Sequence, residues 1–179
     1  SPAEQASYGD HLDHDLRCRR ADEYIRACLQ IWQSKNGADF KGEFFQFENA
    51  RLNTQPFNGQ RPKIYVSGNS ELSRKTALAT ADGWLRYADS PEMIAQSFSS
   101  SAGKILCGLR LSIIARSTRE EAIRAAYRSV ENPDLKWKSF IADIVQKSDS
   151  VAVRSTFDLA NKNGCGWLTD TIWSGAVPY

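Results

Sequence analysis

The sequence has no long hydrophobic run, no excess of one charge and few cysteines. Its 23 Lys and Arg residues nearly balance 21 Asp and Glu residues, and the net charge of +2 is too small to indicate a nucleic-acid-binding protein. No apolar stretch approaches the roughly 18 residues that a membrane span requires, so we expect no membrane association. The four cysteines form no C-x-x-C pair, which argues against a zinc ribbon or a dense disulfide framework and favours reduced thiols in a cytoplasmic protein.

Hydrophobic side chains make up 41% of the 179 residues, which is ordinary for a folded domain and excludes a disordered chain. The first strong pattern is helical and covers residues 13–34, where apolar side chains recur every three or four positions from Ala21 to Trp32. Asp13 is placed to cap the N-terminus of this helix. Residues 40–47 are aromatic and roughly alternating, which predicts a short hairpin or an extended arm.

From residue 63 onward, the pattern alternates between strands and helices. We expect strands at 63–67, 83–88 and 105–115, and helices at 71–80, after Ser90-Pro91, after a capping box at Ser117–Glu120, and across a polar stretch at 133–163. The third strand is nearly continuous in apolar residues, as expected when both faces of a sheet are covered. This alternation predicts an α/β fold with a parallel sheet and crossover helices. Three strands cannot close a (β/α)8 barrel, which takes about 250 residues, so the chain reads as an interior slice of one.

The turn Ser67-Gly68-Asn69-Ser70 lies where the first of these strands ends and a helix begins. Backbone N–H groups and the positive end of the helix favour an anion at such a turn, and glycine permits its close approach. The turn therefore predicts a phosphate site. The alternative is a βα turn that carries small polar residues without a ligand.

Arg110 lies inside the apolar run of the third strand, where a charge must find a partner or line a cavity. If the strand belongs to a barrel, a residue near its carboxyl end points toward the active site. A structural ion pair with a carboxylate is an equally good interpretation.

Both histidines, His11 and His14, lie among aspartates at the start of the first helix. This grouping could ligate a metal ion, but helix capping explains the carboxylates better, so we assign no metal site. No cysteine has a nearby sequence cue for a catalytic base.

Four segments bring a family resemblance. They are Leu12–Tyr24, Phe40–Phe44, Arg61–Glu71 and Gly108–Arg116, and in this order they resemble the bacterial luciferase-like, flavin-dependent monooxygenases, closest to the alkanesulfonate monooxygenase branch. The resemblance covers nearly the whole chain. It implies a TIM barrel that binds FMN at the carboxyl ends of its strands. Residues 1–179 would then form a single partial domain, with about strands five to seven, their helices and part of an insertion, but without the N-terminal half and the C-terminal end.

The resemblance also implies cofactor-binding residues. Family members carry a His and a Tyr, four residues apart, that contact the flavin phosphate or ribityl chain; His14 and Cys18 stand at these positions, so Cys18 departs from the usual Tyr. The phosphate turn of the family falls on Gly68, Asn69 and Ser70, in agreement with the argument from the helix terminus.

Arg110 matches an active-site arginine of the sulfonate enzymes, and Ser112 stands where those enzymes carry a His. The implied activity is that of a two-component monooxygenase. A separate NAD(P)H:flavin reductase supplies reduced FMN, and a flavin C4a-peroxide formed with O2 oxygenates an alkanesulfonate or a similar small organosulfur substrate. A homo-oligomer is implied for the full-length protein. The alternatives are an F420-dependent oxidoreductase of the same superfamily and a non-catalytic flavin-binding paralogue.

Overall fold

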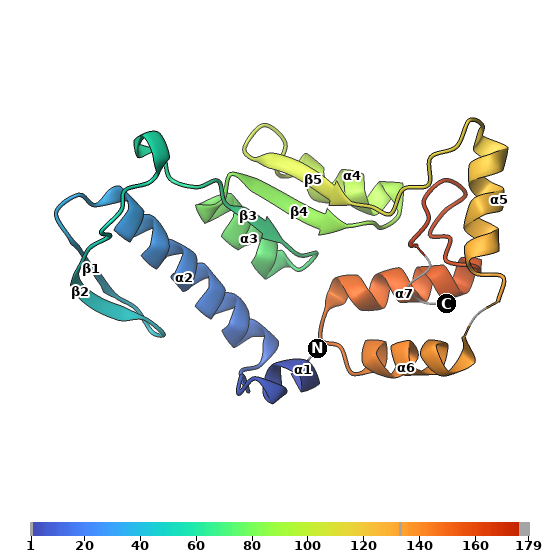
Figure 1. The fold of residues 1–179 in the computed structure, drawn as a ribbon, viewed down its shortest axis with the longest axis horizontal. Helices are drawn as coiled ribbons and strands as arrows, with labels where there is room; N and C mark the ends of the chain where they lie inside the picture. Colours follow the sequence, from blue (N-terminus) through green and yellow to red (C-terminus); the bar gives the residue numbers. More distant parts are fainter. Residues whose placement is uncertain (1, 133, 176–179) are drawn as a thin grey trace.

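The computed structural model describes residues 2–132 and 134–175. Figure 1 shows an extended molecule, in which the last two helices form a hairpin beside a three-stranded sheet. The helices are α1 (Pro2–Ser7), α2 (His14–Gln33), η1 (Phe57–Gly59), α3 (Glu71–Thr80), α4 (Pro91–Ser99), α5 (Arg119–Ser129), α6 (Leu135–Gln146) and α7 (Val151–Asn163). The strands are β1 (Ala38–Lys41), β2 (Gln46–Ala50), β3 (Tyr65–Ser67), β4 (Gly83–Tyr87) and β5 (Leu106–Arg110).

Helix α2 and the hairpin β1–β2 confirm the predictions for the first third of the chain. Asp13 caps α2, because its Oδ1 accepts a hydrogen bond from the Leu16 amide at 2.8 Å. The hairpin is antiparallel, and its turn is held from the side by Glu23 on α2. The Glu23 carboxylate accepts three backbone amides at 2.7–2.9 Å, those of Glu43, Phe44 and Phe45. The arm is therefore attached to the helix.

The sheet is parallel and has the order β3-β4-β5, as the alternating pattern predicts. In its register Ser67 lies beside Leu85, and Tyr87 lies beside Arg110. Helices α3 and α4 make the two crossovers, and each begins at a serine, Ser70 or Ser90, whose hydroxyl accepts an amide of the first turn. The carboxyl ends of all three strands consequently lie along one edge of the sheet.

A small core forms where α7 crosses the carboxyl end of β4 (Figure 1). Ala88, Ala160 and Leu168 are buried together there, and the Thr156 hydroxyl of α7 donates to the Ala88 carbonyl oxygen at 3.4 Å. Trp84 is only 1% exposed and meets Phe98 of α4 edge to face. Within residues 2–132 and 134–175, no helix is both long and apolar enough to cross a membrane.

The third strand differs from its prediction in length and in burial. It ends at Arg110 and not at residue 115, and Leu106 and Leu109 are 59% and 37% exposed. The apolar run predicts two covered faces, but in the described part of the chain β5 pairs with β4 alone and forms the edge of the sheet. The expectation of a long, doubly covered strand is therefore wrong for this structure.

The polar stretch predicted as one helical segment is two helices, α6 and α7. The chain breaks between them because Ser148 Oγ accepts the Ser150 amide at 3.1 Å and Ser150 then caps α7. Pro133, the predicted start of this stretch, lies outside the described residues. The cap of α5 is also one residue later than predicted, since Thr118 and not Ser117 accepts the first-turn amide.

Candidate functional site

A cavity of about 420 Å³ lies between α2, the carboxyl end of β3 and the junction of α6 with α7. We call it the α2–β3 cavity. Its walls include all five residues that the sequence predicts for the cofactor, namely His14, Cys18, Gly68, Asn69 and Ser70. The structure thus brings together two segments that are separated by about fifty residues of sequence.

Three hydrogen bonds with β4 hold the turn after β3. The Gly68 amide donates to the Leu85 carbonyl oxygen at 3.0 Å, and the Trp84 indole N–H donates to the Gly68 carbonyl oxygen at 2.9 Å. Asn69 Oδ1 accepts the Tyr87 amide at 3.0 Å. These three bonds fix the turn at the edge of the sheet before any ligand arrives.

Gly68 and Ser70 shape the start of α3 at the cavity wall. Gly68 has φ +148°, and a Cβ at this position would lie 2.4 Å from Ser73 Oγ, so a larger side chain does not fit. Ser70 Oγ accepts the Ser73 amide at 3.2 Å and caps the helix. The remaining amides of the first helical turn and the helix dipole make this end of the cavity electropositive.

Asn69 contributes a donor that has no acceptor. Its Nδ2 is buried and makes no hydrogen bond in the described part of the chain, although its Oδ1 is fixed by Tyr87. An unsatisfied buried donor costs about 1–3 kcal/mol. An anionic oxygen bound at the turn would satisfy it, which is the expected property of a phosphate site.

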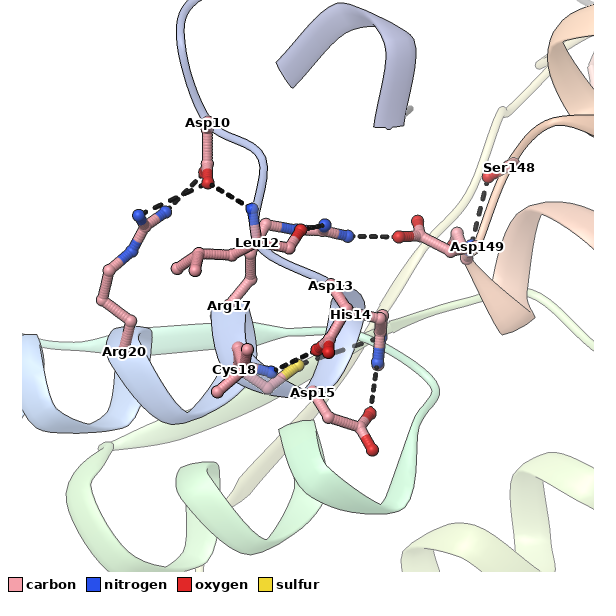
Figure 2. Close-up of polar contacts among 12 residues, drawn as sticks. Asp10, Leu12, Asp13, His14, Asp15, Arg17, Cys18, Arg20, Ser148 and Asp149 are labelled. Atoms are coloured by element: carbon pink, nitrogen blue, oxygen red, sulfur yellow. Dashed lines mark hydrogen bonds and ion pairs between the residues drawn. The ribbon is translucent and has the colours of Figure 1, made fainter. Parts of the chain in front are cut away.

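Figure 2 shows the polar contacts at the start of α2, where His14, Arg17 and Cys18 line the cavity. His14 Nδ1 lies 2.9 Å from Asp15 Oδ1, and since a carboxylate only accepts, Nδ1 carries the proton. His14 Nε2 is then free to accept from the Cys18 thiol at 3.8 Å. Burial raises the pKa of Cys18, helped by the nearby Asp15, so the thiol keeps its proton. Where the family usually carries the phenol of a Tyr, Cys18 therefore supplies a thiol, which is a weaker hydrogen-bond donor and is directed to His14.

Arg17 is a cavity residue that the sequence analysis missed. Its side chain is 13% exposed and pairs with Asp149 at the α6–α7 junction, 132 residues away (Figure 2). Arg17 Nη1 also donates to the Leu12 carbonyl oxygen. Desolvation opposes ionisation of Asp149, but the hydrogen bond and the charge of Arg17, together with a backbone hydrogen bond and the nearby His14, outweigh it and hold the pKa of this carboxyl below its usual range. Helical spacing from His14 could have indicated Arg17, whereas no sequence signal indicates Asp149.

The metal site that the sequence analysis considered and did not assign concerns the same segment, at His11 and His14. Within the ranges that the structure describes, no group of three or more His, Cys, Asp or Glu side chains is arranged to hold a metal ion.

Arg110 lies outside the α2–β3 cavity, beside Tyr87 on the neighbouring strand. Its Nη1 donates to the Tyr87 hydroxyl at 2.6 Å, and its guanidinium carbon is 5.0 Å from the ring centroid. No carboxylate pairs with Arg110 among the described residues, so the structural ion pair is not found there. Because the Tyr87 amide also binds Asn69, one tyrosine connects Arg110 to the turn.

Ser112 is not brought to the α2–β3 cavity either. It follows the end of β5 and lines a second cavity of about 300 Å³, together with Trp167 and Trp173. This second cavity is walled by apolar side chains of α5 and of the segment after α7. The predicted cofactor residues and the predicted catalytic residues therefore occupy different places along one edge of the sheet.

Comparisons with known proteins match the sequence to one family and the fold to two solved structures. Residues 1–161 match the family model described as luciferase-like monooxygenase. An FMNH(2)-dependent dimethylsulfone monooxygenase of Pseudomonas fluorescens (strain Pf0-1) is 30% identical over 164 residues, which are 87% of this chain and 40% of that protein. The chain thus spans well under half the length of this curated relative.

Two solved structures share the fold at low identity. An EDTA monooxygenase from Chelativorans sp. BNC1 superposes with a TM-score of 0.62 at 16% identity, over 90% of this chain and 47% of that one. A riboflavin lyase crystallised with modified FMN and riboflavin gives a TM-score of 0.55 at 18% identity, over 71% of this chain and 35% of that one.

Proposed function

Since this chain belongs to the luciferase-like monooxygenase family, we propose that it is part of a monooxygenase that uses reduced FMN and O2. The proposed substrate is an alkanesulfonate or a similar small organosulfur compound. The related dimethylsulfone monooxygenase, which is named as FMNH(2)-dependent, supports both the cofactor and the organosulfur class. Because such an enzyme receives its flavin already reduced, the proposal includes a separate NAD(P)H:flavin reductase as partner.

The observation that carries the proposal is the α2–β3 cavity. A phosphate bound there would meet the amides at the start of α3, the buried Asn69 Nδ2 and the guanidinium of Arg17. His14 and Cys18 form the opposite wall and would contact the ribityl chain. This donor set fits a phosphorylated flavin.

The catalytic part of the proposal concerns Arg110 and Ser112. Reduced FMN, when bound, supplies the electrons that activate oxygen. Arg110 provides a fixed positive charge, oriented by Tyr87, at the carboxyl end of β5, and this charge favours an anionic substrate such as a sulfonate. Ser112 contributes a hydroxyl two residues further along, beside the apolar side chains of the second cavity.

The proposal assigns β3, β4 and β5 to the fifth, sixth and seventh strands of a (β/α)8 barrel and treats residues 1–179 as one partial domain. The parallel order with two crossover helices supports this assignment, as does the low-identity likeness in fold to the larger EDTA monooxygenase. A barrel also accounts for the exposed apolar side chains of β5, which a following strand would cover. A cytoplasmic homo-oligomer completes the proposal.

The test is a pair of measurements on the full-length protein. Quenching of flavin fluorescence should give much tighter binding of FMN than of riboflavin, which lacks the phosphate. Sulfite release should then require a flavin reductase, NAD(P)H, FMN, O2 and a sulfonate together. Equal affinity for the two flavins would reject the phosphate site, and turnover with reduced F420 without oxygen uptake would replace the monooxygenase by an F420-dependent oxidoreductase.

A further inference from the structure

We infer that Asp149 competes with the flavin phosphate for Arg17 and thereby sets how tightly the α2–β3 cavity holds a phosphorylated ligand. The inference rests on the proposed function and adds a means of regulation to the same site. It assigns a role to the α6–α7 junction, which the catalytic proposal does not use.

The first argument is the charge of the cavity wall. Among the described residues, two side chains of the types Arg, Lys, Asp and Glu line the α2–β3 cavity. They are Arg17 and Asp149, and they form an ion pair with each other. The rest of the wall consists of neutral donors, apolar groups and His14. With the pair intact, the cavity offers a phosphate no net charge from these two residues. Without Asp149 the same wall carries one positive charge.

The second argument is the geometry of Arg17. The guanidinium has five N–H donors in a planar fork, and its two recorded partners are the Asp149 carboxylate and the Leu12 carbonyl oxygen. A phosphate presents oxygens at the spacing of a carboxylate and carries more charge, so it can take the place of Asp149 on the fork. A phosphate that kept Asp149 as its neighbour would face like-charge repulsion instead.

The third argument is where Asp149 can go. Its side chain is 32% exposed, and it lies in the short link between the C-cap of α6 at Lys147 and the N-cap of α7 at Ser150, outside both helices. Ser150 caps α7 with its own hydroxyl, so the helix does not depend on Asp149. The carboxylate can therefore move to solvent at little cost, and its release frees the α6–α7 junction from α2.

The experiment compares binding of FMN and riboflavin to variants of the full-length protein. Asp149→Asn keeps the size of the side chain and removes the competing charge, so FMN should bind about tenfold more tightly while riboflavin is unchanged. Asp143→Asn is the matched control, because it makes the same charge change in an exposed pair with Lys147 on α6. The control should leave both affinities unchanged; an equal gain in the control would overturn the inference.

A double-mutant cycle then tests whether Asp149 acts through Arg17. Arg17→Gln should weaken FMN and not riboflavin, and Asp149→Asn should have no further effect in the Arg17→Gln background. If Asp149→Asn raises the FMN affinity fully even in the Arg17→Gln background, Asp149 repels the ligand directly, and the inferred competition for Arg17 is overturned.

The wild-type protein gives a second measurement that needs no variant. Amide hydrogen exchange at residues 148–151 should become faster on saturation with FMN and stay the same with riboflavin, because only a phosphate displaces Asp149. Unchanged exchange with FMN contradicts the inference. If wild type binds FMN and riboflavin equally, the phosphate site of the proposed function has failed; if it discriminates between them but Asp149→Asn changes nothing, only the inference has failed.

Discussion

The backbone amide of Tyr87 donates to the side chain of Asn69 at 3.0 Å, so the last residue of β4 fixes the turn that follows β3. The same tyrosine accepts a hydrogen bond from Arg110 on β5 through its hydroxyl. One residue of the central strand therefore positions groups that the proposal assigns to cofactor binding and to catalysis. This coupling between neighbouring strands makes the carboxyl edge of the sheet a single preorganised surface.

Ser70→Asp should weaken FMN binding by about tenfold or more, because it places an anion beside the phosphate. Aspartate caps helices as well as serine does, so α3 and the overall stability should be preserved. Ser70→Asn is the matched neutral cap and should bind FMN nearly as the wild type does. Fluorescence titration with FMN and riboflavin checks this prediction, which fails if the aspartate variant binds both flavins normally.

Gly68→Ala should abolish tight FMN binding, since the new Cβ would lie 2.4 Å from Ser73 Oγ and push the turn off its partners. Gly9→Ala is the control: Gly9 also has a positive φ, +80°, but nothing lies within 4 Å of its Cβ position. Both variants should lose about 1 kcal/mol from backbone strain, measured by chemical unfolding. Only Gly68→Ala should lose FMN; equal effects on binding would show that the close contact is irrelevant.

Arg110→Gln should lower kcat/KM for an alkanesulfonate by about 100-fold, because it removes a fixed positive charge near an anionic substrate. The loss should be much smaller for a dialkyl sulfone of the same size, which has no charge. Tyr87→Phe removes the hydroxyl that orients Arg110 and should give an intermediate loss with the sulfonate. Steady-state kinetics with both substrates decide the point; an equal loss with sulfone and sulfonate would exclude the electrostatic role.

Asp82 should stabilise the fold in a pH-dependent way. Hydrogen bonds from Arg61, from the Ile64 amide and from Lys63 hold the pKa of Asp82 far below its ordinary value of 3.8. Because the folded-state pKa is the lower one, this stabilisation is full above the ordinary pKa and is lost as the pH falls below it. Asp82→Asn should therefore lower the melting temperature by about 5 °C at pH 7, with the difference shrinking below pH 4. A difference that is constant from pH 7 to pH 3 would contradict this prediction.

From α2 to α5 the order of strands and helices could be read from the sequence, because local signals mark most boundaries, whereas α1 and the break between α6 and α7 were not predicted. Ser70 and Ser90 cap helices where their hydroxyls are expected to, and Asp13 starts α2. The strand at 105–115 failed for a different reason. An apolar run indicates which residues could be buried in a strand. The length of the strand itself depends on which partner strands are present to pair with it.

The cavity was half predictable. The turn at Gly68–Ser70 follows from the strand-to-helix transition, and the resemblance added His14 and Cys18, but only the tertiary structure brings these segments together. Arg17 lies one helical turn after His14, so the helical periodicity could have predicted that it faces the same side of α2. Asp149 was not, because the break between α6 and α7 and its approach to α2 are products of long-range packing.

The ion pair between Arg17 and Asp149 also bears on how the molecule folds. Closing a contact across 132 residues is entropically costly, so we expect it to form after the local helices and the strand crossovers. The α6–α7 junction therefore joins the cavity wall only in the native state. A flavin bound between these segments should stabilise the native state, so saturating amounts of it should slow global unfolding and proteolysis of the folded protein.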